Sequence, residues 1–193
     1  MFILEVMLMN PPNTSREEIM RVSRKIVSER GLPALNMRAL AKECGIALGT
    51  LYNYYSDKDE LVVAAIESVW QDILEKSPPD SGVSFSQYIT QTYAHIIEKL
   101  KDYPDFLAAH SISVAGSVKG KARGMMERFF GKIRSELHEV LMNDKNVDRS
   151  IFSETFCEEN LIGHILDTIT ISIINGKPDC ATLTEILDRL LYR

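Results

Sequence analysis

Cysteine is scarce in this chain of 193 residues. The three cysteines, Cys44, Cys157 and Cys180, are odd in number and far apart, and they include no CxxC pair and have no histidines at ligand spacing. This pattern argues against a disulfide scaffold and against a zinc site. We therefore expect reduced thiols, as is usual for a cytoplasmic protein, and neither a metal nor a cofactor.

The sequence also lacks the short motifs that accompany common catalytic sites. It has no Gly-x-Ser-x-Gly and no glycine-rich phosphate loop. It contains four histidines, none of which belongs to an HExxH motif or to a pair at metal-ligand spacing: His95, His110, His138 and His164. We expect a protein that is not an enzyme.

A membrane-spanning or targeting segment is missing as well. Residues 1–9 are apolar, but they carry no basic leader and no cleavage site and are too few to cross a bilayer. We expect a cytoplasmic protein without a membrane partner. Residues 1–14 are either an N-terminal arm that packs on a neighbour or the product of a start site assigned upstream of Met7 or Met9.

Net positive charge, the usual mark of a nucleic-acid-binding protein, is absent from the chain as a whole, whose formal net charge is −5. The sign differs along the chain, however. Residues 15–58 carry eight basic and five acidic side chains, whereas the residues after them carry an excess of acids. An acidic body behind a basic head is expected when only one end of a protein faces phosphate.

Helical periodicity is abundant and predicts an all-α fold. Ser15 and Glu18 form a capping box that begins a first helix, and Gly31 ends it. Asn36 caps a short second helix, and a third begins near Leu48. Further helices are predicted over residues 57–73, 84–100, 104–114, 122–142 and 149–174 and from residue 182 onward, with a proline-rich break at residues 77–82.

Residues 38–55 have the pattern of a helix-turn-helix, in which the second helix lies in the major groove of DNA and the first crosses the backbone. Gly45 can adopt the left-handed conformation that the tight turn needs. Ala41, Ile46 and Leu51 can be buried where the two helices cross. Three polar residues then point away from this core and can reach base edges or phosphates: Thr50, Asn53 and Tyr54.

These features make residues 16–70 similar to the tetracycline repressor family of bacterial regulators. The similarity is carried, in the order and spacing of that family, by these stretches: Gly31, Asn36-Met-Arg-Ala-Leu-Ala41, Gly45-Ile46, Gly49-Thr-Leu-Tyr52, Tyr54-Tyr55 and Lys58-x-x-Leu61. Two positions depart from the family pattern. Ala47 replaces a small hydroxyl residue, so that one phosphate contact or cap is missing, and Tyr54 replaces a frequent histidine.

The resemblance implies roles for eight residues of the basic head. It implies phosphate contacts for Asn36, Tyr52, Tyr54 and Lys58, and positions at or near base edges for Arg38, Leu48, Thr50 and Asn53. Structural interpretations compete with these roles: Asn36 as a helix cap, Tyr52 and Tyr55 as core aromatics, and Lys58 as a solvated charge. A basic patch, a tight turn and exposed polar tips within one short segment favour DNA binding.

The resemblance further implies a helical body that binds a small-molecule effector. Soft or aromatic side chains with a few polar groups suit a small apolar ligand. Eight residues of the body are candidates for such a pocket: Tyr93, His95, Phe106, His110, Met125, Met126, Phe129 and His164. Ordinary core packing is the alternative for each of them.

A broad apolar face is predicted on the helix over residues 149–174. Together with the last helix it predicts a four-helix interface between two subunits about a two-fold axis. The candidate interface residues are Phe156, Leu161, Ile165, Ile169, Leu187 and Leu190. Ordinary core is again the alternative.

Together these features predict three parts: an N-terminal arm (1–14), a helix-turn-helix DNA-binding domain of three helices (15–60), and a helical effector-binding and dimerisation domain (61–193). The predicted function is sequence-specific transcriptional regulation by a homodimeric repressor that a small-molecule effector releases from a palindromic double-stranded DNA operator. The competing interpretation is a helical DNA-binding or protein-interaction module without an effector.

Overall fold

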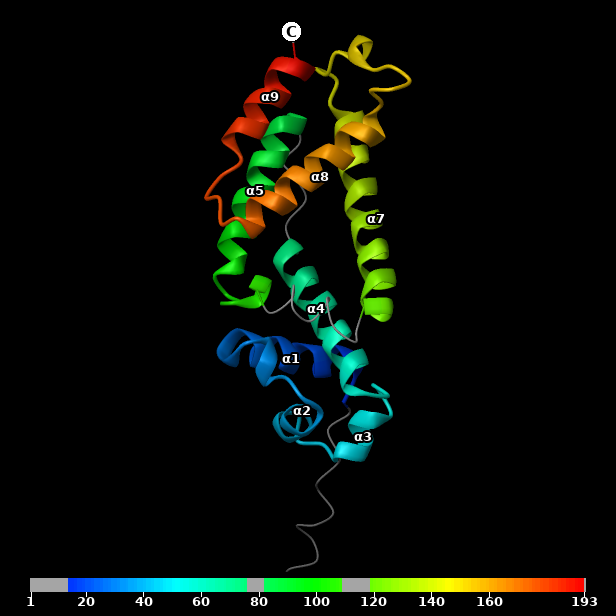
Figure 1. Ribbon diagram of the computed structural model, residues 1–193, viewed down its shortest axis with the longest axis vertical. Coiled ribbons are helices and arrows are strands. Elements are labelled where there is room, and N and C mark those ends of the chain that lie inside the picture. Colours follow the sequence, from blue (N-terminus) through cyan, green and yellow to red (C-terminus); the bar gives the residue numbers. More distant parts are fainter. Residues whose placement is uncertain (1–13, 76–81, 109–118, 193) are drawn as a thin grey trace, which may run out of the picture. The chain divides into compact units, whose positions relative to one another are not determined.

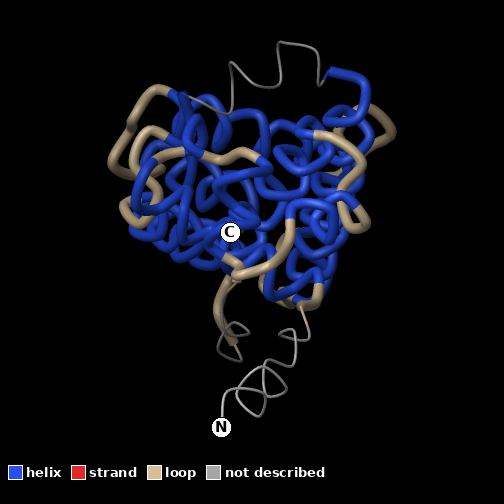
Figure 2. Tube along the Cα trace, turned by 90° about the horizontal axis from the view of Figure 1, so that it is seen from below, coloured by secondary structure: helices blue, strands red, loops and turns tan. Residues whose placement is uncertain are grey.

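The computed structural model describes residues 14–75, 82–108 and 119–192, and its elements within these ranges are helices joined by turns and loops (Figure 1). Figure 2 shows the same described chain without a strand, which confirms the predicted all-α fold. None of the helices in these ranges is both long enough and apolar enough to span a bilayer.

The chain divides into two compact units. Unit 1 comprises residues 1–72 and 102–125, and unit 2 comprises residues 73–101 and 126–193. One division point therefore falls within helix α4 (Lys58–Leu74) and another within α7 (Lys119–Asn143). The domain boundary predicted at residue 60 stays a prediction.

Unit 1 begins with α1 (Arg16–Arg30), whose ends follow from local sequence. The Ser15 hydroxyl accepts a hydrogen bond from the Glu18 amide at 3.2 Å, and the backbone leaves the helix at Gly31 with a φ of 77°. Ile19 and Ile26 lie on the buried face of the helix. A short 3-10 turn, η2 (Leu32–Ala34), follows.

Three further helices complete the N-terminal part of unit 1: α2 (Met37–Glu43), α3 (Leu48–Tyr52) and α4. Asp57 caps α4 by accepting from the Glu60 amide at 2.7 Å. The Glu60 carboxylate accepts from the amide of Ser56 at 2.8 Å. These bonds fix the chain at the start of α4.

Residues 102–108 belong to unit 1, although the residues directly before them, 73–101, belong to unit 2. The Tyr103 hydroxyl donates to the Asp72 carboxylate of α4 at 2.8 Å, and the Phe106 ring meets the edge of Trp70 at 5.6 Å between ring centroids. Asp72 also pairs with Arg24 of α1, at 3.5 Å. This carboxylate thus joins three segments of unit 1.

Unit 2 contains α5 (Phe85–Leu100), most of α7, the 3-10 turn η3 (Arg149–Ile151), α8 (Glu158–Ile174) and α9 (Ala181–Leu191). Helices α5 and α9 pack side by side (Figure 1). Ser84 and Gln87 cap α5 reciprocally. The Tyr93 hydroxyl of α5 donates to the backbone carbonyl of Lys177 at 2.8 Å and so fixes the loop before α9.

The helix predicted over residues 149–174 is wrong in its first part, because α8 begins only at Glu158. Short polar side chains satisfy the backbone upstream of it and so compete with helix formation. The Asp148 carboxylate accepts from the amide of Ser150, and the Ser153 hydroxyl accepts from the amide of Phe156, both at 3.0 Å. The first bond caps the beginning of η3, and the second turns the chain before α8.

A buried carboxylate, that of Asp144, organises the other end of unit 2. It accepts hydrogen bonds from the Phe85 amide at 2.8 Å, the Tyr192 hydroxyl at 2.7 Å and the Asn146 amide at 3.0 Å. Burial alone would raise the pKa of this carboxyl, but these donors and the nearby Arg149 guanidinium outweigh it and hold the pKa below its usual value. The charged form of Asp144 therefore ties the start of α5 to the end of α9.

Candidate nucleic-acid interface

The turn between α2 and α3 is as tight as the sequence predicts. Gly45 has a φ of 66°, in the left-handed region that favours glycine. The Ile46 amide donates to the Ala41 carbonyl at 3.0 Å and the Gly45 amide to the Lys42 carbonyl at 3.2 Å, which is the bonding pattern of a Schellman motif. Ala41 and Leu51 are buried at the crossing and Ile46 is half-buried, so the predicted core of the motif is in place.

The opposite side of α3 is exposed and polar. Thr50, Tyr52 and Asn53 are exposed, and Leu48 is half-buried at the start of the helix. Tyr52 is 49% exposed and so is not a core residue, whereas Tyr55 is buried. The structure thus groups four of the candidate DNA-binding residues on or next to one short helix.

No side chain caps the beginning of α3. Ala47 occupies the N-cap position and offers no oxygen to the first amides of the helix. This is the cap whose loss the sequence predicts. Asn36, in contrast, does cap α2, because its side-chain oxygen accepts from the Ala39 amide at 3.0 Å and its side-chain amide donates to Ala34 O at 3.2 Å.

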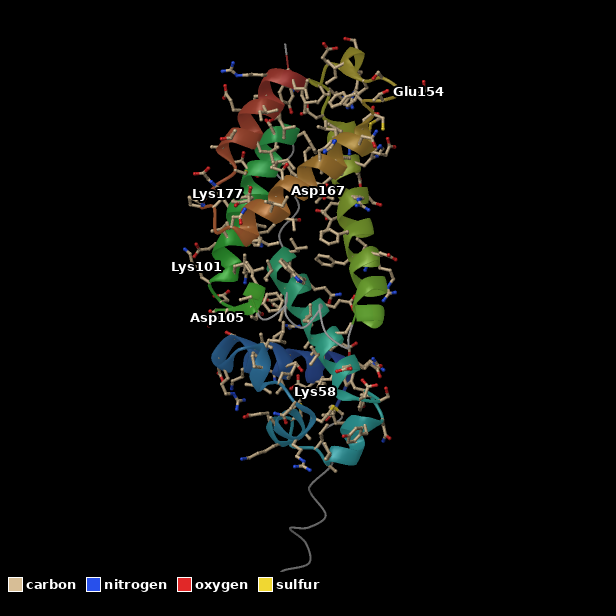
Figure 3. The ribbon with its side chains drawn as sticks, in the orientation of Figure 1. Lys58, Lys101, Asp105, Glu154, Asp167 and Lys177 are labelled. Carbon is tan, nitrogen blue, oxygen red and sulfur yellow. The ribbon has the colours of Figure 1, made fainter. Side chains whose placement is uncertain are left out.

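Apart from Arg16, the basic side chains of residues 15–58 fall into two groups. Four of them lie within 4 Å of a carboxylate: Arg21, Arg24, Lys25 and Arg30. Arg38, Lys42 and Lys58 are exposed, and within the described ranges none of the three has an ion pair. Lys58 stands at the start of α4 (Figure 3). Among these seven side chains, the positive charges without an ion pair therefore lie on α2 and at the start of α4.

Tyr54 is held by the chain itself rather than projecting freely. Its hydroxyl donates to the Thr14 carbonyl, and its own backbone carbonyl accepts from Arg16 Nη2 at 2.7 Å. The Arg16 guanidinium lies over the buried Tyr55 ring, 5.0 Å from its centroid. Burial raises the pKa of Tyr55, and the neighbouring Arg16 charge acts in the opposite direction.

Thr14 and Arg16 are absent from the candidate residues of the sequence analysis. Arg16 counts there only as one positive charge, because its partners follow 38 and 39 positions later. One local signal existed. A cation in the first turn of a helix opposes the helix dipole, so an arginine at this position points to a partner elsewhere.

The candidate pocket residues are divided between the two units. Phe106 is buried in unit 1, whereas Tyr93 is buried in unit 2. His95 is half-buried in unit 2, and its Nε2 is buried without a hydrogen-bond partner among the described residues. Phe129 is half-buried against the edge of Phe130. The pocket as a whole stays a prediction.

Three other pocket candidates lie outside the residues whose side chains the structure describes: His110, Met125 and Met126. The remaining candidate, His164, is exposed on α8. It belongs to the same face as Asp167 (labelled in Figure 3) and Ile171, three and seven residues further along the helix. Tyr93, in contrast, is a buried residue of α5.

Most of the candidate dimer residues are core residues of a single chain, so their placement at a surface needs correction. Four are buried: Leu161, Ile165, Ile169 and Leu187. Phe156 is half-buried and stacks on Phe152, and Leu190 is exposed. The exposed apolar side chains of α8 and α9 are instead Ile171, Ile174, Ile186 and Leu190. Because α8 carries isoleucine or leucine on several faces, periodicity did not separate its inner face from its outer one.

Comparison with known proteins gives matches to bacterial transcriptional regulators. Residues 19–65 match the family model described as bacterial regulatory proteins, tetR family. An uncharacterized HTH-type transcriptional regulator of Haemophilus influenzae is 33% identical over 95 residues, which are 48% of this chain and 50% of that protein. The HTH-type transcriptional regulator UidR of Escherichia coli is 32% identical over 79 residues, 40% of each chain.

The chain thus spans half or less of the length of these curated relatives. Among solved structures, the transcriptional regulator FadR from Bacillus subtilis, in complex with stearoyl-CoA, aligns with a TM-score of 0.49 and 17% sequence identity. That alignment covers 92% of this chain and 98% of FadR. The family match confirms, for residues 19–65, the resemblance drawn from the sequence.

Proposed function

Because the helix-turn-helix domain of this chain belongs to the tetR family of bacterial regulatory proteins, we propose that the protein is a sequence-specific, DNA-binding transcriptional regulator. In this proposal it is a homodimeric repressor that a small-molecule effector releases from a palindromic operator. The observation that carries the proposal is the coincidence of an exposed polar α3 with unpaired basic side chains on α2 and α4.

Helix α3 would lie in the major groove, with Thr50 and Asn53 directed at base edges. Arg38, at the start of α2, would reach a base or phosphate beside them. Tyr52 and Lys58 would contact phosphates on either side of the groove, since both are exposed and close in sequence to α3. These contacts combine sequence reading with electrostatic attraction.

The exposed apolar residues of α8 and α9 support the dimer. Ile171, Ile174 and Ile186 are each more than half exposed, although isoleucine is among the residues most often buried in proteins. A second copy of the same face would cover them about a two-fold axis. Two heads held about one DNA turn apart, roughly 34–36 Å, would then read a palindrome.

The effector would act by stabilising one arrangement of the dimer over another. A ligand that binds more tightly to a form with wrongly spaced heads shifts the population away from DNA. Supporting this role is the orphaned Nε2 of His95, a polar group inside unit 2 that a ligand could satisfy.

The proposal is tested by selection from a pool of random duplexes at two salt concentrations. The native protein is compared with Arg38→Ala and Lys58→Ala, and with the matched controls Arg134→Ala and Lys132→Ala, which remove exposed charges from unit 2. We expect a palindrome to be enriched, with weaker selectivity for Arg38→Ala and a smaller salt slope for Lys58→Ala. No enriched sequence, with all variants alike, would refute DNA reading and favour an interaction module.

A further inference from the structure

The start of α1 is fastened to the end of α3 by the two hydrogen bonds that join Thr14 and Arg16 to Tyr54. We infer that this latch, and not a phosphate contact, is the role of Tyr54 in DNA reading. The inference rests on the proposed function, because it concerns how the reading helix is held. It assigns Arg16 and Tyr54 as positioning residues.

The first argument is the proton of the Tyr54 hydroxyl. A tyrosine hydroxyl has one proton to donate, and a phosphate oxygen can only accept. The Tyr54 proton is already directed to the Thr14 carbonyl. Tyr52 differs in both respects, since it is exposed and its hydroxyl has no hydrogen bond among the described residues. Of the two tyrosines, Tyr52 is the one equipped to donate to phosphate.

The second argument is the weakness of α3 on its own. The helix has five residues and no side-chain cap at Ala47, and so short a helix is unstable without tertiary contacts. Leu51 and Tyr55 anchor its inner side. Arg16 supplies the remaining anchor, because it places a cation on a carbonyl just beyond the C-terminal end, where the helix dipole favours positive charge.

The latch therefore sets the direction of α3 relative to α1 within unit 1. Loss of either hydrogen bond should leave the charges that attract DNA in place while loosening the helix that reads it. Specific binding should suffer more than non-specific binding. A phosphate contact would behave differently, since its loss weakens binding to all sequences alike.

The test uses the full chain with Tyr54→Phe, Arg16→Met and the double variant, and Tyr52→Phe as the matched control that loses an exposed hydroxyl. Affinities are measured by anisotropy for the selected palindrome and for a random duplex of equal length, at a temperature where every variant is folded. For Tyr54→Phe we expect the ratio of the two affinities to fall roughly three- to tenfold. Tyr52→Phe should weaken both duplexes by the same factor.

The double variant distinguishes a joint role of Arg16 and Tyr54 from two independent roles. If Arg16 and Tyr54 act together, the double variant should lose little more specificity than the worse single variant. If Tyr54 binds phosphate, its effect should add in full to that of Arg16→Met. Additive losses, with equal weakening of both duplexes by Tyr54→Phe, would overturn the inference.

Amide hydrogen exchange measured without DNA tests the latch independently of the proposed function. The amides of Tyr54 and Tyr55 both donate to the Leu51 carbonyl at the end of α3. Tyr54→Phe and Arg16→Met should speed exchange of these amides, and Tyr52→Phe should not. Unchanged exchange in Tyr54→Phe would refute the latch. If the native protein selected no duplex, the proposed function would fail and exchange alone would decide the latch.

Discussion

The two units of this chain expose opposite kinds of side chain. In unit 1, Arg38 and Lys58 are exposed without an ion pair among the described residues, while Ile26 and Leu51 are buried. Unit 2 exposes Ile171 and Ile186 and buries the carboxylate of Asp144. Unit 1 thus presents unpaired positive charge on residues 15–58, and unit 2 presents exposed apolar side chains on α8 and α9. Under the proposed function, residues 15–58 would face DNA and the apolar face of unit 2 would face a second copy of the chain.

The largest effect is expected from placing charges on the exposed apolar face of unit 2. Ile171→Asp combined with Ile186→Asp should convert a dimer into monomers, as measured by light scattering, because buried unpaired carboxylates oppose association. Affinity for a palindrome should fall by roughly 10²–10⁴, since the two heads no longer act together. Met142→Asp, which alters another exposed apolar residue, is the control. A double variant that remains dimeric would place the interface elsewhere.

Asp144→Asn removes the buried charge of unit 2. The amide cannot accept from all three donors of the native carboxylate, so the free energy of unfolding should fall by about 2–4 kcal/mol in urea titrations. Glu154→Gln, an exposed residue of the loop before α8 (Figure 3), should change it by less than about 0.5 kcal/mol. Equal effects of the two substitutions would contradict a structural role for the charge.

The same carboxylate predicts a pH dependence. Because the folded-state pKa of Asp144 lies below the ordinary value of an aspartate carboxyl, the stability that its charge contributes is fully present above that ordinary value and is lost as pH falls through the folded pKa. The stability difference between native protein and Asp144→Asn should therefore shrink in acid. Urea titrations at pH 7 and below pH 4 measure this difference in the free energy of unfolding. A difference that grows in acid would contradict a lowered pKa of Asp144.

A smaller effect is expected from removing a tyrosine–carboxylate hydrogen bond, of which each unit offers one example. Tyr103 in unit 1 and Tyr88 in unit 2 both donate to carboxylates, those of Asp72 at 2.8 Å and Glu136 at 2.6 Å. Asp72 is half-buried and Glu136 is exposed, so water can replace only the second bond readily. Tyr103→Phe should cost about 1 kcal/mol of stability and Tyr88→Phe less, by thermal unfolding. The reverse order would show that burial does not govern these bonds.

The smallest expected effect is a gain in unit 1. Ala47→Ser would supply the missing cap of α3 and should raise stability by about 0.5–1 kcal/mol. Ala181→Ser, at the first position within α9 of unit 2, is the control and should give no gain, since a serine there is not at the N-cap. Differential scanning calorimetry distinguishes them. Equal shifts would mean that capping does not limit α3.

Local features of the sequence predicted the helices of unit 1 well. Ser15 and Asn36 each cap a helix by accepting from the amide three residues later, and Gly45 makes its turn through its own positive φ. Each of these features therefore depends only on a short stretch of sequence. The same reasoning placed the exposed residues of α3, because Leu51 and the polar residues beside it differ clearly in character.

Prediction failed where contacts join distant residues or where one residue type covers several faces. The latch joins positions 38 and 40 apart, and nothing near Tyr54 indicates that Thr14 is its partner. On α8, isoleucines occur at both the buried position 165 and the exposed position 171, so apolar character alone does not show which face is covered. The break before Glu158 depends on side-chain bonds of Asp148 and Ser153 that compete with a helix.

The bonds made by Tyr192 imply an order of events during synthesis. Its hydroxyl meets Asp144 and accepts from the Ser86 amide, 106 residues earlier, so the start of α5 cannot be completed until residue 192 has left the ribosome. The contacts between α1 and α3 span no more than 40 residues. Since chains are made from the N-terminus and close contacts along the chain form first, the helix-turn-helix can be assembled while its partner unit is still being translated.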